Sequence, residues 1–117
     1  MSRFITLDSN TDFRRAYGRG KAYTNPALVT YVVKNRAGLC RVGITTSKKI
    51  GNAVQRNRAR RVIREAFLSL DGVHGSFDIV FVARTKTVFK KSTEISAVMH
   101  KHLISAGVIS NAEESSS

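Results

Sequence analysis

The densest group of chemically active side chains in this sequence is a set of seven cations between Lys48 and Arg64, with no acid among them. Arg56, Arg60 and Arg64 recur at i, i+4 and i+8, so on a helix neighbouring pairs would repel by about 0.2 to 0.5 kcal/mol each. Cations near a helix N-terminus also oppose the macrodipole. Because an anion at this helix end would reverse both penalties, the pattern favours a phosphate-binding surface over a merely solvated face.

A helix from about Ala53 to Leu70, ending before Gly72, would give this segment two sides. At 100° per residue, the apolar side chains fall within one arc of roughly 140° and the cations gather on the next arc. The apolar arc holds Ala59, Val62, Ile63, Ala66, Phe67 and Leu70, and the neighbouring arc holds Asn57, Arg60, Arg61 and Arg64, with Arg56 at its border. We expect the apolar arc to pack on the core and the cations to face nucleic acid.

Two asparagines interrupt the charged pattern. Asn52 lies where the helix should begin, so capping the helix and hydrogen bonding to bases are both open roles for it. The spacing does not decide between these two roles for Asn52 or for Asn57. The preceding Gly51 would let a phosphate backbone approach closely. Arginine outnumbers lysine here, which favours two-pronged contacts to phosphate or base edges.

Phe13 and Tyr17 form a second candidate group, since their i, i+4 spacing puts them on one face of a short helix. Tyr31, on a predicted strand, would join them near several cations, including Arg14 and Arg41. Rings among cations suit single-stranded RNA, because each stacked base contributes about 1 to 3 kcal/mol. For Phe13, simple core packing is an equally open interpretation.

Composition limits the partners. Twenty Lys and Arg against eight Asp and Glu give a formal charge of +12 and a pI near 10.8, which points to a polyanion. Nucleic acid and an anionic membrane surface both qualify, but we expect no membrane span or signal peptide, because no long apolar run is present. The lone Cys40 allows no intrachain disulfide, and we expect it to be a small buried hydrophobe in an intracellular, cytoplasmic protein.

The acids and histidines show no spacing suited to a metal site or to catalysis. His100 and His102 lie two apart on a predicted helix, so they would point to nearly opposite sides. We expect His74, in a glycine-flanked loop, to be solvated.

The rest of the chain supplies the elements that must hold these groups, in one domain over residues 1–109 with a disordered polar tail over 110–117. Ser9 and Asp12 predict a capping box at the start of a short first helix that ends at Gly18 and Gly20. We expect two strands joined as a hairpin at Ala37 and Gly38. The predicted strands cover residues 27–33 and 39–47, a central strand covered on both faces covers 77–84, and a last helix covers 92–106.

These residues also carry a family resemblance. The stretch KKIGNAVQRNRARRVIREAF, residues 48–67, closely resembles the RNR motif of the protein subunit of bacterial ribonuclease P, and FRRAYGRG, residues 13–20, resembles the helical opening of that family. The resemblance covers roughly residues 11–106. One departure is Tyr17, where relatives commonly have Phe, which keeps the ring and adds a polar tip.

The resemblance implies an α+β fold: a single-domain α/β sandwich of a four-stranded mixed sheet and three helices. It is similar to the second domain of ribosomal protein S5, with a left-handed βαβ crossover through the basic helix. In that family a catalytic RNA, assisted by the small protein, removes the 5′ leader of precursor tRNA with Mg²⁺ held mainly by the RNA. The implied partners are therefore the catalytic RNA and precursor tRNA, with no membrane, no small-molecule substrate, and no catalytic or metal-ligating residue in the protein.

Carried over residue by residue, the resemblance implies two contact sets. The residues that would contact the catalytic RNA are Lys48, Lys49, Asn52, Arg56, Asn57, Arg58, Arg60, Arg61 and Arg64. The residues that would line the cleft for the single-stranded leader are Phe13, Tyr17, Tyr31, Arg14 and Arg41. A general RNA-binding module is the rival interpretation, and a DNA-binding regulator is a weaker one, since the apolar arc of the basic helix should be committed to the core.

Overall fold

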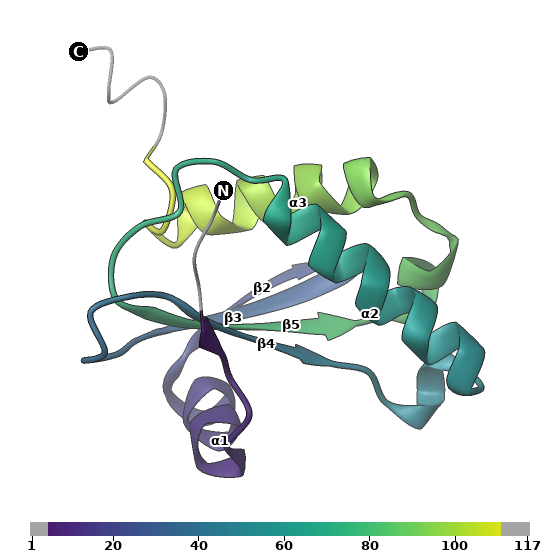
Figure 1. The fold of residues 1–117 in the computed structure, drawn as a ribbon, viewed down its shortest axis with the longest axis horizontal. Coiled ribbons are helices and arrows are strands. Elements are labelled where there is room, and N and C mark those ends of the chain that lie inside the picture. Colours follow the sequence, from purple (N-terminus) through teal and green to yellow (C-terminus); the bar gives the residue numbers. More distant parts are fainter. Residues whose placement is uncertain (1–4, 111–117) are drawn as a thin grey trace.

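The computed structural model describes residues 5–110, which form a five-stranded sheet with helices on both faces (Figure 1). The strands are β1 (Ile5–Thr6), β2 (Lys21–Asn25), β3 (Leu28–Lys34), β4 (Arg41–Thr45) and β5 (Phe77–Ala83). The helices are α1 (Asn10–Arg19), α2 (Ala53–Leu68) and α3 (Ser92–Ser105), with the 3₁₀ helices η1 (Lys48–Ile50) and η2 (Thr85–Phe89). Helix α1 covers one face of the sheet, and α2 and α3 cover the other.

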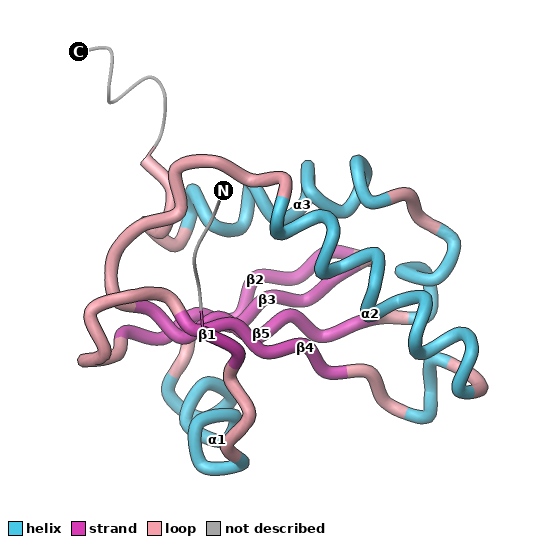
Figure 2. Tube along the Cα trace, viewed as in Figure 1, coloured by secondary structure: helices cyan, strands magenta, loops and turns pink. Residues whose placement is uncertain are grey.

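The strand order is β1-β4-β5-β3-β2, with β5 at the centre (Figure 2). Strand β5 pairs parallel with β4 and antiparallel with β3, while β1 adds to β4 in parallel and β2 adds to β3 antiparallel. The chain passes from β4 through α2 to the adjacent parallel β5, and this crossover is left-handed. Such crossovers are nearly always right-handed, so the predicted exception is confirmed.

The central position of β5 follows from its sequence. Ile79 and Phe81 pack toward α2 and α3, whereas Val80 joins a smaller cluster beneath α1 with Leu7 and Ala16. All five of these side chains are buried. A strand covered on both faces has no polar side, which explains its continuous apolar run.

The fold prediction is confirmed in its class, its three helices and its central strand, but the sheet has five strands rather than four. Strand β1 has only two residues, and both are exposed. The sequence therefore contains no apolar alternation that would indicate this strand. Backbone hydrogen bonds hold this segment to its neighbour, from Ile5 N to Cys40 O (3.3 Å) and from Leu7 N to Val42 O (2.8 Å).

The predicted hairpin at Ala37 and Gly38 is wrong, because β5 lies between the two strands that this loop connects. The tight hairpin instead joins β2 to β3. There the Oδ1 atom of Asn25 accepts a hydrogen bond from Ala27 N at 2.8 Å across Pro26, an asparagine turn. Strand β5 is the most apolar strand, and it pairs with β3 on one edge and β4 on the other. This central position of β5 keeps β3 and β4 from pairing with each other, although they are neighbours in the sequence.

The predicted capping box of α1 is also wrong. Ser9 is the N-cap residue, but its side chain makes no capping hydrogen bond. The carboxylate of Asp12 instead lies 3.6 Å from Nη1 of Arg41. Helix α2 ends at Leu68, two residues earlier than predicted, and Leu70 is buried just beyond it. The predicted polar tail lies outside the described residues, except for Ser110.

One buried carboxylate joins these elements. Asp78, on β5, has a fully buried side chain that accepts hydrogen bonds from Nε of Arg41 at 2.7 Å and Nη2 of Arg41 at 2.8 Å. Asn35 Nδ2 donates to the same carboxylate at 2.8 Å, and Arg15 Nη1, from α1, lies 3.6 Å away. Asp78 therefore ties α1, the β3–β4 loop and β4 to the central strand.

We predict that Asp78→Asn lowers the free energy of unfolding by about 3 kcal/mol, because Arg41 and Arg15 lose their buried counter-charge while the side-chain volume is kept. Urea unfolding measures the change. Asp71→Asn, at an exposed acid, is the matched control and should lie within about 0.5 kcal/mol of the wild type. Equal stability of the two variants would contradict this role for Asp78.

Candidate nucleic-acid interface

Helix α2 places the predicted cations on the outside of the molecule because its apolar arc is committed to the core. Ala59, Val62, Ile63, Ala66 and Phe67 are all buried. The Phe67 ring packs against that of Phe81 on β5, with centroids 5.7 Å apart. Burying each large apolar side chain contributes about 1.5 to 3 kcal/mol, so the rotation of α2 about its axis is fixed. The predicted division of this helix into two sides is confirmed.

A closed capping box fixes the N-terminus of α2. Asn52 Oδ1 accepts from Gln55 N at 2.9 Å, and Gln55 Oε1 accepts from Asn52 N at 3.0 Å. Gly51 has φ +140°, where a Cβ would collide with the Gln55 side chain, so this box requires glycine before it. The capping interpretation of Asn52 is therefore confirmed, and its contact with RNA stays a prediction.

Three arginines of α2 are held by neutral acceptors. Arg56 Nη1 donates to Gly51 O at 2.7 Å, and Arg58 Nε donates to Val88 O at 2.8 Å. Arg60 donates to the carbonyl of Ile44 at 3.1 Å and to the hydroxyl of Thr46 at 2.9 Å. Carbonyls and hydroxyls orient a guanidinium without cancelling its charge, so these groups remain fully cationic.

The side chains of the other predicted contact residues form no hydrogen bond or ion pair within residues 5–110. Lys48, Lys49, Asn57, Arg61 and Arg64 are exposed. Among residues 5–110, no carboxylate forms an ion pair with any cation of η1 or α2. The charge of this surface is thus left for an external anion to neutralise.

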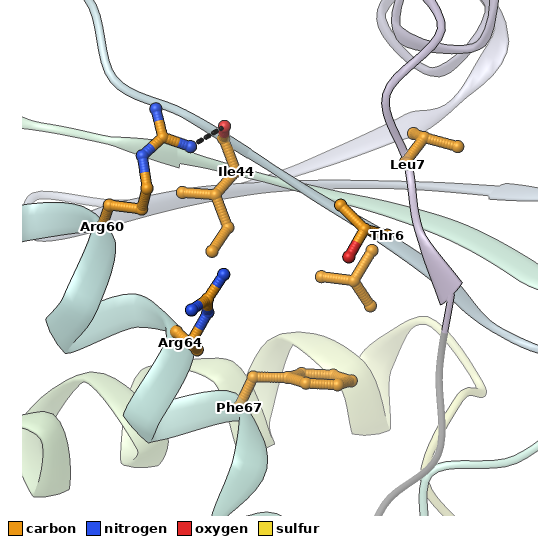
Figure 3. Close-up of a pocket in the computed structure, with 7 residues that line it drawn as sticks. Thr6, Leu7, Ile44, Arg60, Arg64 and Phe67 are labelled. Carbon is orange, nitrogen blue, oxygen red and sulfur yellow. Dashed lines mark hydrogen bonds between the residues drawn. The ribbon is translucent and has the colours of Figure 1, made fainter.

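A small pocket of about 90 Å³ opens between α2 and the edge of the sheet (Figure 3). Arg60 and Arg64 flank it from α2, and Ile44 and Phe67 supply apolar walls. Thr6 completes the rim only because β1 pairs with β4, which sequence reasoning did not foresee. The pocket sets apolar surface directly beside two guanidinium groups.

The aromatic residues predicted to line a leader cleft come together on the opposite face of the sheet. The Tyr17 ring lies 5.0 Å from that of Tyr31, edge to face, and 6.3 Å from that of Phe13. Tyr17 is 41% exposed, and its hydroxyl shares a 2.8 Å hydrogen bond with Thr45 Oγ1 at the end of β4. Phe13 and Tyr31 are half-buried. The packing interpretation of Phe13 is supported because its ring packs on the small cluster, while its contact with a leader stays a prediction.

The two arginines of the predicted leader set lie in different surroundings. Arg14 is exposed on α1. Arg41 is committed to Asp78 and Asp12 near the start of β4, whereas Tyr17 contacts its end. The hydrogen bond to Asp78 raises the pKa of Arg41 further, so it stays charged at all relevant pH values. Arg41 therefore has a structural role at the start of β4, and its contact with a leader stays a prediction.

Other titratable groups are structural. Cys40 is buried as predicted, and burial raises the pKa of its thiol, which disfavours the reactive thiolate. His102 is buried beside Thr30, with Nδ1 2.8 Å from Oγ1, and burial lowers its pKa, whereas His100 is exposed. Within residues 5–110, His, Cys, Asp and Glu form no group of three that could hold a metal, and no helix is long and apolar enough to cross a membrane.

Comparisons with known proteins agree on one family. The family model described as Ribonuclease P matches residues 1–107. The chain is 44% identical over 111 residues to the ribonuclease P protein component of Clostridium novyi (strain NT), covering 92% of this chain and 98% of that protein. It is 41% identical over 104 residues to that of Clostridium botulinum (strain Loch Maree / Type A3), covering 87% and 94%.

Solved structures show the same likeness. The RNase P protein of Staphylococcus aureus superposes with a TM-score of 0.78 at 32% identity, covering 92% of this chain and 99% of that one. The RNase P protein of Thermotoga maritima gives a TM-score of 0.73 at 29% identity, covering 84% and 94%.

The aromatic group depends on a close contact that can be tested. A Cβ at Gly43 would lie 2.6 Å from Phe13 Cζ and 3.3 Å from Leu7 Cβ. We predict that Gly43→Ala forces the Phe13 ring outward and lowers the free energy of unfolding by roughly 1 to 3 kcal/mol in urea unfolding.

Gly18→Ala is the matched control, because a Cβ there meets nothing within 4 Å and alanine favours the helix by roughly 0.5 to 1 kcal/mol. The two substitutions should therefore change stability in opposite directions. A neutral or stabilising effect of Gly43→Ala would show that Phe13 is not tightly seated.

Proposed function

Since this chain belongs to the ribonuclease P protein family and so to the machinery that processes the 5′ ends of tRNA, we propose that it binds the catalytic RNA through η1 and α2 and the single-stranded 5′ leader of precursor tRNA through its aromatic group. It thereby promotes endonucleolytic removal of the leader. The hydrolysis itself is carried by the RNA subunit, and the protein acts in the cytoplasm.

The observation that carries this proposal is the unneutralised charge of α2. A protein selected for stability alone would place carboxylates among Arg56, Arg60 and Arg64, because unrelieved repulsion along one helix face is unfavourable. Here the guanidinium groups are oriented by neutral acceptors or left free. An RNA backbone would supply the missing negative charge, and its phosphates suit the guanidinium fork.

The two contact surfaces meet at one end of β4. Thr45 shares a hydrogen bond with Tyr17, and the next residue, Thr46, accepts one from Arg60. Lys48 and Lys49 follow immediately in η1. A leader stacked on Tyr17 therefore runs directly toward the cations that face the catalytic RNA, which suits a protein that holds substrate beside an RNA active centre.

The protein contributes position and charge rather than bond chemistry. The described side chains do not fit a metal site, and within this proposal the Mg²⁺ chemistry is supplied mainly by the RNA subunit. The arginine side chains of α2 would hold the RNA backbone, and the aromatic rings would hold leader bases by stacking.

A general RNA-binding module would share both the basic surface and the aromatic group, but it should bind leader-bearing and mature tRNA alike. A DNA-binding regulator needs a helix free to enter a groove, whereas the apolar arc of α2 is buried against the sheet. A binding preference for leader-bearing over mature tRNA therefore separates the proposal from the general RNA-binding module.

We predict that the protein enhances cleavage of precursor tRNA by a bacterial-type catalytic RNA at Mg²⁺ concentrations where the RNA alone is slow. The variant to compare with the wild type is the double substitution Arg61→Glu/Arg64→Glu. Both side chains are exposed, so the fold does not depend on them. Charged hydrogen bonds are replaced by repulsion, so we expect roughly tenfold or greater loss of enhancement. Absence of enhancement by the wild-type protein in this cleavage assay would refute the proposal.

We also predict that Tyr17→Ala weakens binding to leader-bearing precursor tRNA roughly tenfold while leaving mature tRNA almost unchanged, because one stacked base is lost. Tyr17→Phe removes only the hydroxyl bonded to Thr45 and should bind precursor within about twofold of the wild type. Equilibrium binding of each variant to both RNAs measures the difference. Equal weakening on both RNAs would favour the general RNA-binding module.

A further inference from the structure

Four arginines from three segments of the chain line an open hollow of about 480 Å³ on the α1 side of the sheet. They are Arg15 and Arg19 of α1, Arg36 of the β3–β4 loop and Arg41 of β4, with Ala37 between them. The hollow could hold many waters, since one water occupies roughly 30 Å³ of liquid, and so it has room for a phosphate group. Of the residues that line the hollow, only Arg41 belongs to the contact sets that the family resemblance implies.

The charges around the hollow do not balance. Asp78 serves both Arg15 and Arg41, and Asp12 lies 3.6 Å from Arg41. The side chains of Arg19 and Arg36 are exposed and form no ion pair or hydrogen bond with residues 5–110. The donors of these two guanidinium groups are thus available, and the hollow keeps an excess of positive charge.

Half of the hollow is already fixed in place. Arg41 is held by a two-pronged bond to the buried Asp78, and Arg15 is held by Asp78 and by the carbonyl of Lys34. Asn35 orders the loop that carries Arg36: its Nδ2 donates to Leu39 O at 3.1 Å, and its Oδ1 accepts from Ala37 N at 2.9 Å. Groups that are ordered before binding lose little entropy on binding, so the hollow is prepared for an anion.

Local structural roles account for only part of this arrangement. Arg19 lies in the last turn of α1, where the helix dipole favours a cation. That reason does not apply to Arg36, which lies in a loop beside three other arginines. Four like charges around one hollow raise the energy of the free protein, and a bound anion removes that penalty.

The hollow shares only Arg41 with the surfaces assigned above. Arg41 begins β4 and Thr45, which Tyr17 contacts, ends it, so the two places lie about 13 Å apart along the strand. Helix α2 lies on the opposite face of the sheet from α1 (Figure 1). An anion bound at Arg41 would therefore lie on the opposite face of the sheet from α2.

We propose that this hollow binds one phosphate group of an RNA backbone, as a further contact surface of the protein. The chemistry of the site is recognition of a phosphodiester by arginine forks. The proposal rests on the proposed function for the identity of the RNA, which is either the catalytic RNA or precursor tRNA.

The test removes the two arginines that the fold does not use, in the double variant Arg19→Ala/Arg36→Ala. Its affinity for each RNA, measured separately over a series of KCl concentrations, is compared with that of Lys86→Ala/Lys101→Ala, which removes the same charge from exposed positions of η2 and α3. Losing one phosphate contact should lower the slope of log affinity against log salt by about 0.7 beyond the control. Affinity near physiological salt should fall roughly tenfold.

An excess loss with the catalytic RNA alone, with precursor tRNA alone or with both supports the proposal and identifies the source of the phosphate. Slopes and affinities equal to those of the lysine control with both RNAs would overturn it. A second variant, Arg19→Lys/Arg36→Lys, keeps the charge and the fold; it should retain the slope but lose roughly threefold in affinity, because lysine lacks the fork. Affinity of this variant equal to the wild type would also count against the site. Failure of the wild-type protein to enhance cleavage refutes the proposed function, whereas enhancement with no excess loss refutes only the hollow.

Discussion

The arrangement of this molecule depends on one buried carboxylate, Asp78, and the two arginines that share it. Burying a charge is unfavourable unless a partner and further hydrogen bonds satisfy it, and Asp78 obtains both from Arg41 and Asn35. Those partners come from β4 and the β3–β4 loop, while Arg15 comes from α1. The carboxylate therefore fixes how α1 sits over the sheet, and with it the aromatic group and the arginine hollow.

The protein uses arginine in two different ways. Beneath α1, Arg41 is neutralised by acids and serves the fold. On α2, Arg58 and Arg60 donate to neutral carbonyls and keep their charge for a partner. The difference lies in the surroundings, since both groups consist of the same residue type. A count of cations in the sequence does not distinguish these two roles, whereas the hydrogen-bond partners do.

The parts of the fold that were predicted correctly are those fixed by local pattern. The apolar arc of α2 and the apolar run of β5 lie where periodicity places them. The errors concern pairing and capping. The predicted hairpin at Ala37 is wrong because β5, from a distant part of the chain, lies between the two strands. The predicted capping box is wrong because Asp12 pairs with Arg41 instead. Both errors arise from partners that local sequence cannot reveal.

The sequence by itself determined the charge, the two sides of the basic helix, and the family motif, because each of these depends on residue type and spacing along one element. Only the tertiary structure decided which cations stay free, that Tyr17 and Arg60 bond to consecutive residues at the end of β4, and that Arg19 and Arg36 share a hollow. The physical reason is that neutralisation and burial depend on distances between segments far apart in the chain, which the topology of the sheet sets.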